Sequence, residues 1–214
     1  ETRQTLLTGQ GQVHIETTVE KLRRKYNVEV NLNIPKVPYK ETFRKKVRVQ
    51  GKHKKQSGGH GQYGDCWVEF DPLERGTGYQ FVDKIVGGVI PKTYIPAVDK
   101  GIAEASQKGV LAGFPCIDFQ AKVDDGSYHS VDSSEMAFKI AGSLAFKKAM
   151  EQADPVLLEP IMEMEVITPE EFMGDIMGDL NSRRGRVLGM ESRGKNQVVR
   201  ALVPQAEVLT YAPD

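Results

Sequence analysis

The chain has 214 residues, of which 39% are hydrophobic and 27% are charged, a composition that argues against intrinsic disorder. The 29 basic residues are balanced by 29 acidic residues, which excludes a strongly basic nucleic-acid binder as a description of the whole chain. No run of about 18 apolar residues predicts a membrane span. The two cysteines lie far apart, so we expect reduced thiols in a cytoplasmic protein. Both ends look cut, and we expect a piece of a longer protein.

The first 37 residues predict one helix and one strand. A stripe of apolar residues predicts a helix over 12–26. Alternating apolar and polar residues predict a strand over 28–32. The two prolines within 34–39 then indicate a linker.

The middle of the chain predicts an α/β domain. Strands are expected near 43–49 and over 66–70, 79–82 and 116–123, and helices over 95–108 and 133–152. Asp132 is the expected N-cap of the second helix, with Glu135 completing a capping box. Its small face (Ala137, Ala141, Ala145) predicts close packing on a sheet.

A second proline-marked segment, 154–160, precedes the last elements. They read as a strand, a helix from Pro169 to about Arg183, two strands and the start of a further helix, at 161–167, 169–183, 186–191, 197–203 and 205–211. This βαββα order is one strand short of a repeated split βαβ unit. We therefore expect a multi-domain protein of the α+β or α/β class.

Charge is segregated along the chain. Residues 36–60 carry nine lysines and arginines against one acid, Glu41, whereas 151–182 carry nine acids and no base. Such asymmetry predicts a polyanionic partner for one end of the molecule. The alternative is a solvated strand face whose acids come from elsewhere in the fold.

The glycines at 59, 61 and 64 match G-x-G-x-x-G, but a strand follows them where a dinucleotide site needs a helix. We interpret this segment as a hairpin loop that approaches RNA, because lysines bind phosphates and polar side chains discriminate. The alternative is an ordinary long hairpin loop. His129 lies just before a predicted helix and has no catalytic partner beside it in sequence, so a solvent-exposed histidine is its alternative reading.

No P-loop motif and no zinc-ligand spacing occur, so we expect no catalytic residue, metal or cofactor in this chain. The rival hypothesis is a small-molecule enzyme that uses the glycine loop and His129. Nucleotide-induced thermal shifts would distinguish the two hypotheses, because a ligand at 100 times its Kd adds about 2.7 kcal/mol of stability.

Longer motifs resemble the C-terminal half of bacterial elongation factor G, a translational GTPase, over essentially the whole chain: QSGGHGQYG at 56–64, GGVIPK at 87–92, DGSYH at 125–129, and the stretches 94–101, 131–142, 155–161 and 178–185. The resemblance implies that 1–37 form the end of domain III (ferredoxin-like, incomplete). It likewise implies that 38–157 form domain IV, similar to domain 2 of ribosomal protein S5. Residues 158–214 would form domain V, ferredoxin-like and missing its C-terminal end.

The same resemblance implies a monomeric cytoplasmic factor that promotes translocation of tRNA and mRNA on the ribosome, with no membrane partner. GTP and Mg²⁺ would bind in a GTPase domain outside this sequence. Two tip loops of domain IV would contact tRNA and mRNA in the decoding region, and the segment near Arg183 would lie near the sarcin–ricin loop of rRNA. The implied binding residues are Lys54, Lys55, Gln56, Ser57, Gly58, Gly59, His60, Gly61, Gln62, Tyr63, Asp125, Gly126, Ser127, Tyr128, His129, Arg183 and Arg184.

His129 falls where the eukaryotic and archaeal counterparts carry a modified histidine. The sequence departs from main-line members at 53–55, at His60 and at 65–66. A paralogue specialised for ribosome recycling or another ribosomal task is therefore the alternative function.

Overall fold

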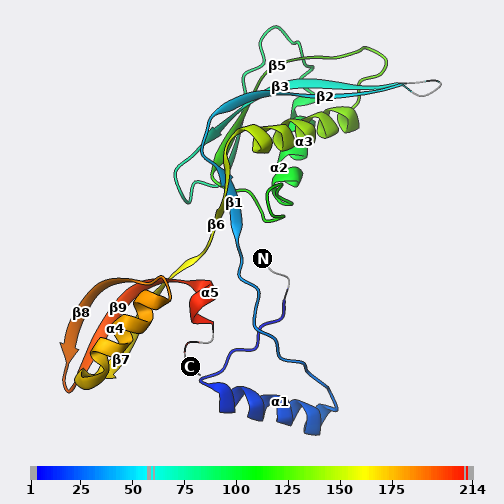
Figure 1. Ribbon diagram of the computed structural model, residues 1–214. Coiled ribbons are helices and arrows are strands. Elements are labelled where there is room, and N and C mark those ends of the chain that lie inside the picture. The colour runs from blue at the N-terminus through cyan, green and yellow to red at the C-terminus, as the bar shows by residue number, and fades with distance from the viewer. Residues whose placement is uncertain (1–3, 57–58, 60, 210, 212–214) are drawn as a thin grey trace. The chain divides into compact units, whose positions relative to one another are not determined.

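The computed structural model describes residues 4–56, 59, 61–209 and 211 (Figure 1). Contacts divide the chain into a middle unit, residues 39–158, and a second unit that combines 1–38 with 159–214. Within the part of the chain that is described, no helix is long and apolar enough to cross a membrane.

The N-terminal segment contains one helix, α1 (Gln12–Tyr26), as predicted. It ends at Asn27, which adopts the left-handed conformation (φ 52°) and donates its backbone N–H to the carbonyl of Arg23 at 3.0 Å. The predicted strand over 28–32 is wrong: the backbone there is irregular and its apolar side chains are exposed. Alternation alone does not make a strand, and no described strand pairs with this segment.

The middle unit is built on a four-stranded sheet in the order β2-β3-β5-β4. Neighbouring strands are antiparallel except for the parallel pair β4–β5; the strands are β2 (Val47–Lys55), β3 (Gln62–Pro72), β4 (Tyr79–Asp83) and β5 (Phe119–Ser127). Two helices, α2 (Ile95–Ser106) and α3 (Glu135–Gln152), pack against each other and cover one face of this sheet (Figure 1). A short antiparallel pair, β1 (Lys40–Phe43) with β6 (Pro155–Leu158), carries the chain into and out of the unit.

The predicted close packing of α3 on the sheet is confirmed. Its alanines at 137, 141, 145 and 149 are at most 1% exposed. A Cβ on Gly51 of β2 would overlap the carbonyl oxygen of Ala141, and one on Gly64 of β3 would lie 2.5 Å from that of Ala137. Aromatic rings fill the remaining core, with Phe70 and Phe119 each 6.2 Å or less from the ring of Phe43.

Three predicted boundaries shift for identifiable reasons. The strand expected from residue 116 begins at Phe119, because Asp118 has a left-handed backbone (φ 60°) and its carboxylate accepts hydrogen bonds from two turn N–H groups. The same strand continues to Ser127, where a loop was expected from residue 124, because its end pairs with β3. The N-cap of α3 is Ser134, whose hydroxyl accepts from the N–H of Ala137 at 3.2 Å, and not Asp132.

The C-terminal part confirms the predicted βαββα order. Its elements are β7 (Ile161–Pro169), the 3₁₀ turn η1 (Glu170–Phe172), α4 (Met173–Ser182), β8 (Arg186–Arg193), β9 (Asn196–Pro204) and α5 (Gln205–Val208). The sheet order is β7-β9-β8, and Leu180 of α4 packs on the buried side chains of β9. The chain therefore has the mixed α/β multi-domain fold that the sequence predicts.

A buried carboxylate fixes the loop between α2 and β5. Glu41 of β1 is fully buried, and its two carboxylate oxygens accept four backbone N–H bonds of 2.7–3.0 Å, from Val110, Leu111, Ala112 and Phe114. Burial acts to raise the pKa of Glu41, but these hydrogen bonds outweigh it and hold the pKa below its ordinary value.

We expect Glu41→Gln to destabilise the middle unit by about 3 kcal/mol at pH 7, because the amide leaves buried N–H donors without an acceptor. Urea unfolding followed by the fluorescence of Trp67, the only tryptophan, measures this change. The Glu41 contribution is present above the unfolded pKa and is lost as pH falls through the lowered folded pKa. The difference between variant and wild type should therefore narrow below about pH 4.

The matched control is Glu151→Gln, an exposed glutamate at the end of α3, which should change stability by less than about 0.5 kcal/mol. Equal stability of wild type and Glu41→Gln at pH 7 would contradict the role assigned to this carboxylate.

Candidate nucleic-acid interface

The first loop predicted to bind RNA is the end of the β2–β3 hairpin. The two strands pair from Val47 with Phe70 to Lys55 with Gln62, and the His53 Nε2 lies 2.8 Å from the Gln62 side-chain oxygen across them. The polar and basic side chains at this end are exposed at positions 54, 55, 56 and 62. Three predicted binding residues, Ser57, Gly58 and His60, lie outside the described residues.

The second predicted loop begins as the end of β5. Asp125, Gly126 and Ser127 pair with residues 67, 66 and 65 of β3, and a register shift leaves Asp124 as the extra residue of a bulge. Beyond the strand, Tyr128 is 50% exposed and His129 is exposed. The sheet therefore brings both loops to the same end of the middle unit.

Asp132 joins the two loops. Its carboxylate accepts a hydrogen bond from the N–H of Gly61 at 3.0 Å, and its backbone carbonyl accepts one from the N–H of Tyr63 at 2.8 Å. The residue that the sequence predicts as a helix cap thus bonds the hairpin instead. Both loops form one rigid unit because these bonds satisfy backbone groups of the hairpin from the other loop.

The His129 ring is oriented by its own loop. Its Nδ1 accepts hydrogen bonds from the N–H groups of Val131 (3.3 Å) and Asp132 (3.2 Å), which places the ring proton on Nε2. The ring centroid lies 6.4 Å from that of Tyr63. His129 therefore presents an exposed N–H donor next to an aromatic ring, a combination suited to RNA bases and phosphates.

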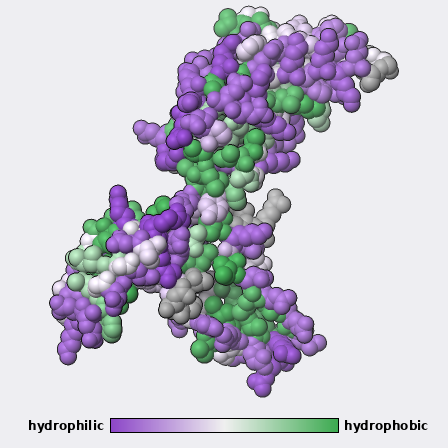
Figure 2. Space-filling model, viewed as in Figure 1, coloured by the Kyte–Doolittle hydropathy of each residue, from purple (hydrophilic) through white to green (hydrophobic). Residues whose placement is uncertain are grey.

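A shallow pocket of about 180 Å³ lies between the loops. It is lined by residues of both: Lys54, Lys55, Gln56, Gln62, Tyr63, His129 and Asp132. Figure 2 shows a largely hydrophilic surface over this end of the unit. The structure thus brings together six predicted binding residues, whereas Asp125 and Gly126 lie further down β5.

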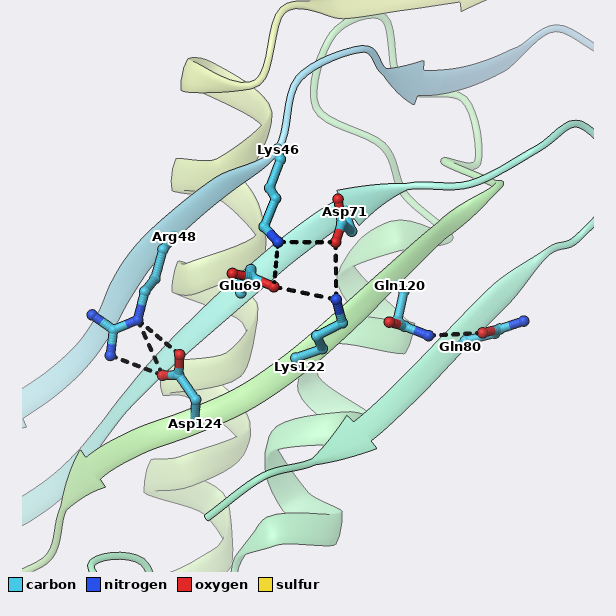
Figure 3. Close-up of polar contacts among 8 residues, drawn as sticks. All are labelled: Lys46, Arg48, Glu69, Asp71, Gln80, Gln120, Lys122 and Asp124. Atoms are coloured by element: carbon cyan, nitrogen blue, oxygen red, sulfur yellow. Dashed lines mark hydrogen bonds and ion pairs between the residues drawn. The ribbon is translucent and has the colours of Figure 1, made fainter. Parts of the chain in front are cut away.

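The structure divides the basic block of residues 36–60 into two parts. On the open sheet face, Lys46 binds Glu69 (2.8 Å) and Asp71 (3.3 Å), and Arg48 binds Asp124 at 2.8 Å (Figure 3). The hydrogen bond from Lys46 contributes most to lowering the pKa of Glu69 below its ordinary value. The alternative reading, acids supplied from elsewhere in the fold, is therefore correct for these two cations.

The tip lysines differ. Lys54 and Lys55 are exposed and make no ion pair within the described ranges, and Lys52 is 3.7 Å from Asp65. The positive charge available to a polyanion near the pocket is therefore concentrated at the end of the hairpin.

The two arginines predicted in the C-terminal part are far along the chain from this pocket and bind partners of their own. Arg184 contacts Glu159 (2.8 Å) and Glu207 (3.0 Å), and hydrogen bonding to Glu159 chiefly raises its pKa. Arg183 bonds the Asp179 carboxylate at 3.0 Å and lies 4.9 Å from the ring centroid of Tyr211. RNA binding by either arginine stays a prediction.

Sequence reasoning missed two residues of the site. Asp132 was assigned to the helix, although its place two residues before the true N-cap is a signal that its side chain is available. Asp65 is 6% exposed within β3 and bonds side chains of both neighbouring strands. An acid directly before the strand predicted over 66–70 was its only signal.

Comparisons with known proteins agree with this architecture. Family models match along the chain: "Elongation Factor G, domain III" at residues 1–34, "Elongation factor G, domain IV" at 35–154 and "Elongation factor G C-terminus" at 156–214. The fold and the matched models define a translation elongation factor. The chain belongs to the elongation factor G family.

A solved structure is also similar. The crystal structure of ttk003000868 from Thermus thermophilus is 55% identical over 96% of this chain, with a TM-score of 0.84. This chain spans 30% of the length of that protein.

We expect Asp132→Ala to separate the two loops, because the Gly61 N–H loses its acceptor. Hydrogen exchange of peptides covering residues 61–64 should become faster, by about fivefold if the lost bond is worth about 1 kcal/mol. The control is Asp125→Ala, whose carboxylate accepts only the N–H of the next residue among the bonds described. Equal exchange in the two variants would contradict the joining role of Asp132.

Proposed function

We propose that this chain is the ribosome-binding part of a translational GTPase of the elongation factor G type, and that it promotes movement of tRNA and mRNA. The observation that carries the proposal is the pocket between two joined loops, with exposed lysines and an oriented His129 beside it. The matching domain models give the ribosome as the expected partner.

The proposed role is steric and electrostatic. A domain with a close-packed core occupies the site that tRNA leaves, and its lysines contact phosphates while Tyr63 and His129 contact bases or sugars. Within this proposal the decoding-region tRNA and mRNA bind the middle unit, and rRNA near the sarcin–ricin loop binds the C-terminal part. The factor acts as a monomer in the cytoplasm.

The residues of this chain do not fit a GTP site. The glycine-rich segment joins antiparallel strands β2 and β3, so no helix N-terminus follows it to hold phosphates. We propose that GTP and Mg²⁺ bind a separate domain of the full-length protein and that this chain itself performs no catalysis. The His129 Nδ1 is already occupied by backbone N–H groups, which favours binding over general-base chemistry.

The direct test is mRNA movement on pre-translocation ribosomes by the full-length protein with GTP. Rapid movement supports the proposal. GTP turnover without movement contradicts translocation and favours the specialised paralogue, which a subunit-splitting assay then tests.

We expect Lys54→Gln combined with Lys55→Gln to weaken ribosome binding and to make the dependence of log Kd on log salt shallower by about 1.5, because two phosphate contacts are lost. Titration of the full-length protein at several KCl concentrations measures the slope. The control pair, Lys45→Gln with Lys148→Gln, removes the same charge at exposed lysines outside the pocket. A slope unchanged by the tip variant would show that these lysines do not meet phosphates.

We expect His129→Ala to slow single-round mRNA movement about tenfold, because one oriented N–H donor is lost. Ribosome-stimulated GTP turnover should stay within about twofold, since the histidine does not contact GTP. His129→Gln keeps a side-chain N–H and should recover part of the rate. Loss of GTP turnover together with movement would overturn this separation of roles.

A further inference from the structure

We infer that Asp65 is a positioning residue: it fixes the orientation of Tyr63 and thereby the wall of the RNA pocket. This inference rests on the proposed function of the tip. Asp65 lies in β3 opposite Lys52 of β2 and Ser127 of β5, so the three side chains form one row across the sheet. It is only 6% exposed, although it carries an acidic side chain on the face without helices.

Each oxygen of the carboxylate has a partner on a neighbouring strand. Oδ1 accepts from the Gln50 amide at 2.8 Å, and Oδ2 accepts from the Ser127 hydroxyl at 2.8 Å. The Tyr63 hydroxyl lies 2.7 Å from the Ser127 oxygen and 3.4 Å from Oδ2, and the Lys52 Nζ is 3.7 Å away. Asp65 therefore connects all three strands that carry the tip.

The ionised form sets the direction of this chain of hydrogen bonds. A carboxylate only accepts, so the Ser127 hydroxyl must donate to Asp65, and its oxygen is then the acceptor for the Tyr63 O–H. An asparagine amide could donate to the serine oxygen instead and compete with the Tyr63 hydroxyl. The charge of Asp65, and not only its shape, thus holds the Tyr63 hydroxyl in place.

Tyr63 transmits this constraint to the site. Its ring lines the pocket, with the Lys52 Nζ 5.7 Å from the ring centroid on one side and the His129 ring 6.4 Å away. Its backbone N–H bonds the carbonyl of Asp132 in the second loop. A tilt of Tyr63 therefore changes both the aromatic wall and the contact between the loops.

The test is Asp65→Asn in the full-length protein. We expect single-round mRNA movement at saturating factor to slow about tenfold while GTP turnover stays within about twofold. In a Tyr63→Phe background the same substitution should change the rate by less than about twofold, because the hydroxyl it positions is gone. Additive losses in the double variant would overturn the inference.

Asp71→Asn is the matched control, since Asp71 lies on the same face of β3 and is paired with Lys46 and Lys122 away from the tip. It should lower thermal stability without slowing movement. Loss of movement equal to that of Asp65→Asn would assign the effect to stability and overturn the inference.

Hydrogen exchange without ribosomes keeps this inference separate from the proposed function. Peptides covering 128–133 should exchange faster in Asp65→Asn than in wild type or Asp71→Asn. If wild type moves no mRNA, the proposed function fails while this exchange difference still tests the positioning role. Unchanged exchange together with unchanged movement would overturn the role of Asp65.

Discussion

The tip of the middle unit depends on the close approach between α3 and the β2–β3 hairpin. Gly51 and Gly64 lie against backbone carbonyls of α3, and the alanine face of the helix leaves no room for larger side chains. Dense packing of this kind resists bending, because any tilt of the hairpin forces atoms into contact. The same helix begins directly after the second loop, so one packing contact holds both parts of the candidate interface.

Electrostatics along the hairpin change from internal to external. At the base, Lys46 and Arg48 bind acids of neighbouring strands and stabilise the sheet face. Further along, Lys52 is shared with Asp65, and at the end Lys54 and Lys55 have no described ion pair. A polyanion therefore meets the strongest uncompensated positive potential at the tip, where the polar pocket also lies.

Local patterns predicted most of the fold, because α1, α3 and the C-terminal βαββα order follow from periodicity and turn residues. The two loops of the site were predicted, but their connection was not. The bond from Gly61 to Asp132 spans 71 residues, and no local rule reveals such a partner. The strand over 28–32 failed for the related reason that a strand needs a neighbour.

The β1–β6 pair has a consequence for how this family can diversify. Lys40 and Leu158 are direct partners in that pair, so the chain enters and leaves the middle unit at adjacent points. A unit whose two ends meet can be exchanged as a single cassette, since only two neighbouring junctions must be kept. Paralogues could thus acquire a new tip, and with it a new task, through recombination at this doorway while every other domain stays as it was.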